Sequence, residues 1–106
     1  MENKFIPIPH IGNVLVEEFL EPLNISQNAL ALATNVPSNR INAIVRGQRG
    51  ISADTDLRLT KYFGLSQGYF LILQSNLELL EQSRKIEKEL ENIVPFKYHD
   101  KQKFAL

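Results

Sequence analysis

The apolar side chains of this 106-residue chain recur with the spacing of α-helices, and no segment alternates polar and apolar residues as a strand would. Four apolar residues define the inward face expected of the first helix: Ile11, Leu15, Phe19 and Leu23. The acidic Glu17, Glu18 and Glu21 fall largely outside that face. Pro22 limits how far the helix continues. The pattern therefore predicts an all-α fold that opens with an amphipathic packing helix.

Two short helices separated by a tight turn are expected next. Ser26 is a good N-cap for the first of them, QNALALAT, in which we expect Leu30 and Ala33 to face inward. Asn35 tolerates a left-handed backbone in the turn. Pro37 presets the first turn of the second helix, SNRINAIVRG. Two short helices around such a turn are typical of a helix-turn-helix.

The helix after this pair has its own start and stop signals. Ser52 is suited to cap its N-terminus, and Gly64 is suited to end it. Asp54 and Asp56 lie in or near the first turn, where the helix dipole favours negative charge. The residues expected to face the core are Leu57, Thr60 and Phe63.

A long final helix is expected to begin near Ser66 and to run to about Asn92, because no proline intervenes before Pro95. Its second half carries an apolar stripe: Ile86, Leu90 and Ile93. The earlier helices have apolar faces for one another, so this stripe needs another cover: a second copy of the chain, a partner protein or the tail. We favour packing in a dimer. The predicted organisation is a helical domain over residues 1–94 and a tail without clear periodicity over residues 95–106.

The second helix of the short pair has two faces of different chemistry. At about 100° per residue, Ile41, Ile44 and Val45 fall on the inward face. The candidate base-contacting residues on the opposite face and its flanks are Ser38, Asn39, Arg40, Asn42, Ala43 and Arg46. Asparagine pairs with adenine, arginine with guanine or phosphate, and a small alanine admits the thymine methyl group. Candidate phosphate contacts are Ser26, Gln27 and Arg49. Although the net charge is zero, no acidic residue lies between Pro22 and Ala53, so this segment is suited to the major groove.

Other classes of site are disfavoured by the residues present. The chain has no cysteine, which excludes disulfides and thiolate metal sites and, with a start unlike a signal peptide, favours a cytoplasmic location. His10 and His99 are the only histidines, and neither has the spacing of a metal site, so we expect no metal and no cofactor. No nucleophile, base and orienting group occur together, so we expect no enzyme. The apolar run YFLIL at 69–73 is too short for a membrane helix, which needs roughly 20 residues, and we interpret it as core rather than as a ligand pocket.

Three segments resemble the HigA family of antitoxins, also called VapI, a branch of the lambda-repressor-like helix-turn-helix proteins. They lie within residues 8–80 and read HIGNVLVEEFLEPLNISQNALA, VPSNRINAIVRGQRGISADTDLRLTKYFG and LSQGYF. The chain departs from the family pattern at two helix starts. Ile11 follows His10 where the family usually has proline, and Gln67 and Gly68 replace its usual Pro-Glu.

The resemblance implies a five-helix DNA-binding domain, here with an extended C-terminal helix, that forms a homodimer and represses its own operon. It also implies a HigB-type toxin partner, a ribosome-dependent messenger-RNA nuclease that the antitoxin neutralises. The family's third helix supplies base contacts, which carry over to the six residues named above, with Arg49 as a phosphate contact.

The resemblance does not say where a toxin binds. A basic nuclease fits an acidic surface, and we favour Glu17, Glu18 and Glu21 on the first helix. A second acidic patch lies on the last helix: Glu78, Glu81, Glu87, Glu89 and Glu91. Two alternatives remain: a stand-alone regulator without a toxin, and a protein-interaction module that has lost DNA binding. Arg46 and Arg49 argue against the second.

Overall fold

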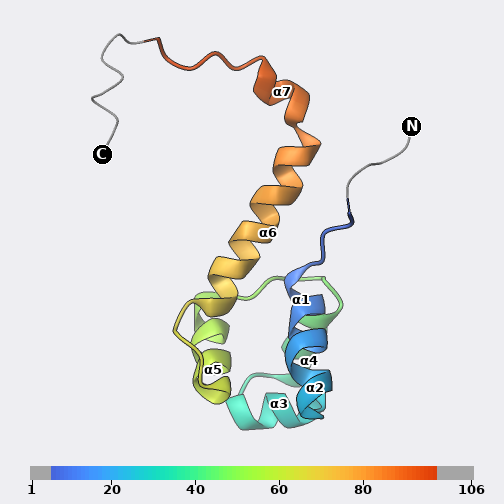
Figure 1. Cartoon of the computed structure of the whole chain (residues 1–106). Coiled ribbons are helices and arrows are strands. Elements are labelled where there is room, and N and C mark those ends of the chain that lie inside the picture. Colours follow the sequence, from blue (N-terminus) through green and yellow to red (C-terminus); the bar gives the residue numbers. More distant parts are fainter. Residues whose placement is uncertain (1–5, 98–106) are drawn as a thin grey trace.

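The computed structural model describes residues 6–97, and all regular structure in that range is helical (Figure 1). The elements in chain order are α1 (Ile11–Val14), η1 (Leu15–Leu20), α2 (Glu21–Leu23), α3 (Gln27–Thr34), α4 (Ser38–Val45), α5 (Ala53–Phe63), α6 (Tyr69–Lys85) and α7 (Glu87–Glu91). The first three form one continuous helix, since the residues at their junctions have helical backbone angles. The predicted all-α fold is confirmed. Most of the tail, including His99, lies outside the described residues.

The first helix begins with a capping box built on His10. The His10 Nδ1 atom accepts a hydrogen bond from the Gly12 N–H at 3.0 Å. In return, the Asn13 side-chain oxygen accepts one from the His10 N–H at 3.1 Å. These two bonds satisfy backbone donors that have no partner within the helix. The chain therefore begins this helix at Ile11 with a histidine cap, without the family's usual proline.

The middle of the first helix is a π turn. Glu21 donates its backbone N–H to the Val16 carbonyl, five residues earlier, and the next residue, Pro22, has no N–H to donate. A π turn contains an extra residue, which rotates the positions that follow it. Leu20 is therefore buried. The prediction that Leu23 faces the core is wrong, because this rotation leaves the residue 56% exposed.

The turn between α3 and α4 follows the predicted chemistry. Ser26 caps α3, with its hydroxyl oxygen accepting a hydrogen bond from the Ala29 N–H at 3.0 Å. Asn35 has a left-handed backbone with φ of 56°, as expected. Val36 is buried in the turn, and Pro37 is the N-cap residue of α4. The turn therefore holds the two helices on a shared core.

The inward face of α3 is only partly the predicted one. Leu30 is fully buried, as expected, but Ala33 is exposed and that prediction is wrong. Ala31 and Thr34 are buried instead. A buried threonine is tolerated here because its hydroxyl donates a hydrogen bond to the Leu30 carbonyl at 2.7 Å. The short helix therefore packs along a face that includes a polar residue.

In α5 the buried face lies to one side of the predicted one. Thr60 is buried and Phe63 packs against the core, but Leu57 is 46% exposed, so its predicted inward position is wrong. The buried residues of this helix are Thr55, Asp56, Leu59 and Thr60. The prediction gave an inward position to the apolar Leu57, whereas the polar Thr55 and Asp56 are the residues buried at the start of this helix.

An aromatic cluster joins the first helix to α5 and α6. The Phe19 ring lies 4.9 Å from the Phe63 ring and 5.3 Å from the Phe70 ring, measured between centroids. Tyr69 packs edge-on against Phe70 at 5.2 Å. Such offset and edge-on contacts stabilise a core beyond the area they bury. Residues far apart in the sequence are therefore held together at the base of α6.

Asp56 of α5 caps α6 from outside that helix. Its carboxylate accepts backbone hydrogen bonds from Gly68, Phe70 and Leu71 at 2.7, 2.9 and 3.1 Å. Gly68 has φ of 89°, which favours glycine, and α6 begins one residue later, at Tyr69, close to the expected start near Ser66. This buried carboxylate therefore fixes where α6 starts and how it joins α5.

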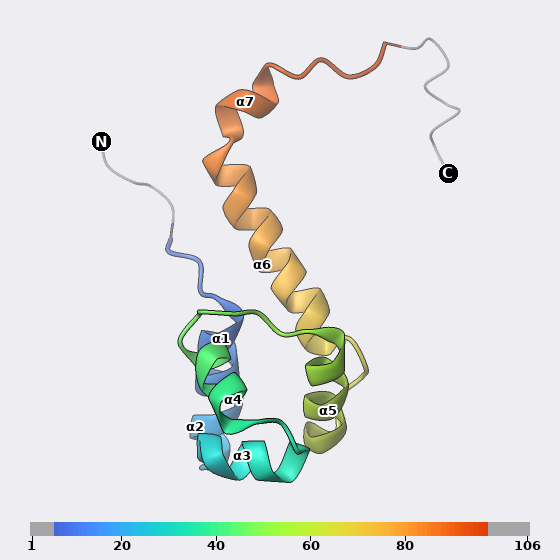
Figure 2. The same cartoon turned by 180° about the vertical axis from the view of Figure 1, so that it is seen from behind.

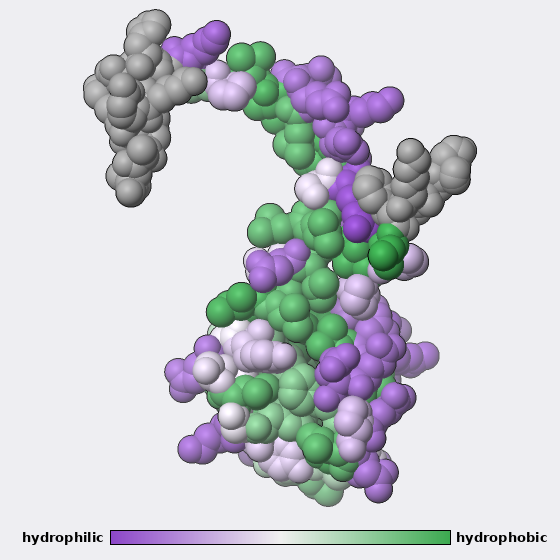
Figure 3. Space-filling view, in the orientation of Figure 1, coloured by the Kyte–Doolittle hydropathy of each residue, from purple (hydrophilic) through white to green (hydrophobic). Residues whose placement is uncertain are grey.

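Beyond its base, α6 projects away from the other helices (Figures 1 and 2). It is not continuous to Asn92, because the backbone of Ile86 leaves helical geometry and the short α7 follows. Of the apolar run at 69–73, Phe70 is fully buried and Leu73 packs on the core, but Ile72 is 62% exposed, so the core interpretation holds only in part. Apolar side chains gather along the exposed side of α6 (Figure 3). Within residues 6–97, no helix has both the length and the apolar character needed to cross a membrane.

Candidate DNA-binding surface

Helix α4, the candidate recognition helix, is held against the core by the apolar packing of its inner face. Ile41 and Ile44 are fully buried and Val45 is half-buried, so the predicted inward face is confirmed. Gly12 of α1 lies against the Ile44 carbonyl so closely that a Cβ atom there would overlap the oxygen. The first helix therefore packs against the inward face of α4, and the opposite face of α4 is left toward solvent.

The outward face of α4 presents the predicted polar groups. Four of the six candidate base-contacting residues are exposed: Ser38, Asn39, Asn42 and Arg46. Arg40 and Ala43 are half-buried at the edges of this face. Amide, hydroxyl and guanidinium groups thus share one side of a short helix, an inventory suited to the edges of base pairs.

A chain of hydrogen bonds links the two helices of the pair across this face. The Asn42 side-chain amide donates to the Gln27 Oε1 atom at 3.3 Å, and Arg46 Nη1 donates to Asn42 Oδ1 at 3.5 Å. Because the Gln27 oxygen is used in this way, its amide nitrogen remains as a donor for an acceptor such as a phosphate oxygen. Gln27 and Asn42 were predicted for different roles, and the structure brings them together.

Arg40 is engaged by α5. Its Nη1 atom lies 3.9 Å from the Asp54 carboxylate, which also binds Arg58 Nε at 2.9 Å. Arg58 in turn donates to the Thr34 carbonyl at the end of α3, at 3.2 Å. The Arg40 Nε atom is buried and has no hydrogen-bond partner among the described residues. One carboxylate thus holds two arginines where α3, α4 and α5 meet.

Sequence reasoning missed this network. Asp54 was assigned only to the dipole of α5, and Arg58 was not considered. The four-residue spacing of Asp54 and Arg58 was a usable signal, since residues at that spacing are neighbours on a helix. The contact with Arg40 depends on how α4 and α5 pack, and no local pattern indicates it.

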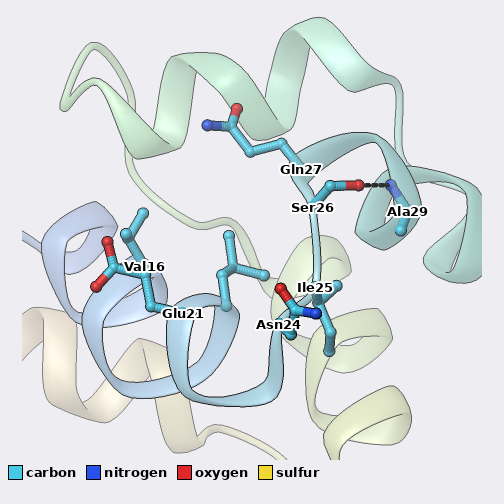
Figure 4. Close-up of a pocket in the computed structure, with 8 residues that line it drawn as sticks. Val16, Glu21, Asn24, Ile25, Ser26, Gln27 and Ala29 are labelled. Atoms are coloured by element: carbon cyan, nitrogen blue, oxygen red, sulfur yellow. Dashed lines mark hydrogen bonds between the residues drawn. The ribbon is translucent and has the colours of Figure 1, made fainter.

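The remaining candidate phosphate contacts lie beside the recognition helix. Arg49 is exposed in the loop between α4 and α5. Ser26 and Gln27 line a hollow of about 470 Å³ between the end of the first helix and the start of α3 (Figure 4). Glu21 lines the same hollow, whereas Glu17 and Glu18 are exposed on η1. The acidic patch predicted on the first helix therefore extends, at Glu21, to the candidate phosphate contacts.

Comparison with known proteins agrees with this arrangement. The helix-turn-helix family model matches residues 16–70, which include α3, the turn and α4. Virulence-associated protein I of Dichelobacter nodosus is 46% identical over 82 residues, which cover 76% of each chain.

Two solved structures from Pseudomonas aeruginosa are also similar. Antitoxin HigA with the higBA promoter has a TM-score of 0.77 and 39% identity, with 86% of this chain and 100% of that chain covered. The protein PA4674 in complex with its 18-bp operator DNA has a TM-score of 0.80 and 39% identity, with 89% and 100% covered. The chain belongs to the helix-turn-helix family and, within it, to the HigA/VapI antitoxins.

Proposed function

We propose that this protein is the antitoxin of a toxin–antitoxin pair, a non-enzymatic cytoplasmic protein that binds operator DNA through α4 and represses its own operon. The observation that carries the proposal is the outward face of α4, where exposed Asn39, Asn42 and Arg46 lie on a helix that apolar packing holds rigidly. Two relatives at 39% identity have been solved with promoter or operator DNA, which supports DNA binding by this chain.

We assign two kinds of DNA contact to this surface. Base contacts come from Ser38, Asn39, Arg40, Asn42, Ala43 and Arg46, and phosphate contacts come from Ser26, Gln27 and Arg49. Ser26 uses its hydroxyl oxygen to cap α3, and its O–H remains as a donor to a phosphate oxygen. Phosphate contacts set the position on the duplex, and base contacts set the sequence preference.

The test is titration of the protein against the DNA upstream of its own gene and against a scrambled duplex of equal length. We expect the parent to prefer the upstream DNA, and Asn39→Ala to lose about 1 to 3 kcal/mol of that preference, as expected for a base contact. Asn92→Ala, at an exposed asparagine after α7, is the matched control. Equal affinity of the parent for both duplexes would overturn the proposal.

We further propose a homodimer that forms along α6. Each copy contributes one reading head, the helices from α1 to α5, and the two heads bind the two halves of an inverted repeat. Exposed apolar residues recur every seventh position at Ile72, Leu79 and Ile86, the spacing of a helix-helix seam. Leu80 widens the stripe, and Leu90 and Ile93 extend it beyond α6. Half-sites should then lie about 34 to 36 Å apart, or a multiple of that distance.

For the toxin, we propose an mRNA-cleaving HigB-type partner that docks on the first helix. Glu17, Glu18 and Glu21 are exposed and offer negative charge to a protein that must be basic to hold RNA. Because Glu21 shares its hollow with Ser26 and Gln27, changing it would also alter DNA binding. The pair Glu17 and Glu18 therefore gives the cleaner test.

In the experiment, cells express the toxin encoded by the neighbouring gene together with a variant of this protein. The test variant is Glu17→Lys/Glu18→Lys, and the control is Glu87→Lys/Glu89→Lys, from the alternative patch on α7. We expect the first variant to lose rescue of growth while keeping operator affinity within a few-fold of the parent, and the control to rescue. Rescue by the first variant would rule out the first-helix patch. A parent that binds its operator and rescues no neighbouring toxin would be a stand-alone regulator.

A further inference from the structure

Gln74 of α6 holds the loop that follows the recognition helix. Its side-chain oxygen accepts a hydrogen bond from the Ile51 N–H at 2.7 Å, and its side-chain nitrogen donates one to the Ile51 carbonyl at 3.0 Å. Gln74 is half-buried and Ile51 is 3% exposed. A two-point contact of this kind fixes both the position and the orientation of the loop backbone.

The geometry of the loop depends on this contact. The loop runs from the end of α4 past the base of α6 to α5 (Figure 2). Gly50 permits the close approach, since a Cβ atom there would lie 2.7 Å from Gln74 Oε1. At the other end, Gly47 has φ of 78° and packs against the His10 ring. Arg49, an exposed candidate phosphate contact, lies between these two points of attachment.

Behind the loop is a hollow of about 200 Å³. Arg49 lines it together with Gln74 and two acidic residues of α6, Glu78 and Glu81. Opposite charges attract, so once the loop is freed from Gln74 these carboxylates would draw Arg49 toward them, in competition with a phosphate. The contact with Ile51 opposes that movement, because it holds the loop at a fixed distance from α6.

We propose that Gln74 is a positioning residue for DNA binding: it fixes the loop relative to α6 and in this way holds Arg49 at the phosphate backbone. The inference rests on the proposed operator binding. A different face of the same helix carries the apolar stripe of Ile72 and Leu79. In a dimer joined along that stripe, Gln74 sets the placement of each DNA-contacting loop relative to the helix that joins the two heads.

A double-mutant cycle in operator binding tests the proposal, with the salt dependence of affinity as the readout. Arg49→Ala should lower the slope of log affinity against log salt by about one unit per head. Gln74→Met, which keeps the size and removes both hydrogen bonds, should lower operator affinity by about tenfold and reduce the slope by a similar amount. The double variant should lose no more than either single one, because Gln74 acts through Arg49. Gln67→Met, at an exposed glutamine before α6, should bind like the parent.

A second variant breaks the contact without changing Gln74. In Gly50→Ala, the atom that must move is the flexible end of the Gln74 side chain, so the fold is disturbed little. This variant should reproduce the reduced slope, and the Ile51 amide should exchange with solvent faster than in the parent.

Three results would overturn the proposal: an unchanged slope in both Gln74→Met and Gly50→Ala, additive losses in the double variant, or an equal loss in Gln67→Met. Failure of the proposed function is a different result, since the parent itself would then not distinguish its operator from a scrambled duplex.

Discussion

The DNA-reading head and the α6–α7 arm use apolar residues in opposite ways. In the head, formed by the helices from α1 to α5, Leu30, Ile41 and Ile44 have no exposed surface, and the outward face of α4 carries polar groups. Along the arm, Ile72 and Leu79 are 62% and 66% exposed. Apolar patches of this kind mark surfaces that another molecule covers. The apolar residues of the head are thus covered within one chain, whereas those of the arm are left uncovered and form the seam of the proposed dimer.

The largest expected effect is on the arm. Leu79→Asp/Leu80→Asp should convert the dimer to a monomer, because two charges would enter the proposed seam. A monomer loses the gain from binding two half-sites at once, so operator affinity should fall by about a thousandfold. Sedimentation and DNA titration measure the two effects, with Gln82→Asp on the same helix as the control. If this variant remained dimeric, the dimer interface would not include Leu79 and Leu80.

The second prediction concerns the joint between head and arm. Asp56→Asn should lower the free energy of unfolding by about 3 kcal/mol, because hydrogen bonds to a charged group contribute roughly 1.5 to 3 kcal/mol each. The carboxylate serves three backbone donors, and an amide would turn its own donors toward some of them. Urea denaturation measures the change. Asp54→Asn, at an exposed ion pair, should cost less than about 1 kcal/mol. Equal costs for both variants would contradict this account of Asp56.

The third prediction separates two arginines of the head. Arg46→Ala should lower operator preference by about 1 to 3 kcal/mol if it contacts a base. Arg40, half-buried at the edge of this face, is within reach of a phosphate as well as of a base. If the phosphate contact dominates, Arg40→Ala should weaken binding to all duplexes alike and lower the salt slope by about one unit. Titrations of operator and scrambled DNA at several salt concentrations compare them. Equal changes in operator preference and in salt slope for the two variants would contradict the assignment of Arg46 to a base and of Arg40 to a phosphate.

The smallest expected effect is on the charge around Arg40. Asp54→Asn removes the carboxylate that Arg40 and Arg58 share. Both arginines should then attract phosphate more strongly, so affinity for scrambled DNA should rise by about threefold and the salt slope should steepen. Operator affinity should rise less, because base contacts are unchanged. A fall in affinity for scrambled DNA would show instead that Asp54 holds Arg40 in its binding position.

Much of the head follows from its sequence because its signals are local. Ser26, Asn35 and Ser52 perform the capping and turn roles that their chemistry predicts, and the outward face of α4 follows from helical spacing. The failures have physical causes that lie outside such patterns. Leu23 is displaced by a π turn, and Leu57 is displaced by buried polar residues that find partners elsewhere in the fold.

In the candidate site, too, features that depend on one helix could be predicted and contacts between distant segments could not. The exposure of Asn39, Asn42 and Arg46 could be predicted, since it depends on one helix. The contacts of Arg40 with Asp54 and of Gln74 with Ile51 could not, because each joins segments that meet only in the folded chain. The break at Ile86 also lacked a signal, as no glycine or proline lies there.

The Asp56 cap leaves the side chains of α6 open to substitution. The carboxylate holds α6 through main-chain N–H groups, which every amino acid except proline provides. The side chain at Leu71 is thus free to change as far as this anchor is concerned, while Asp56 itself and the backbone geometry at Gly68 are not. Substitutions can therefore change the exposed surface of α6 without disturbing the backbone hydrogen bonds by which Asp56 attaches this helix to α5.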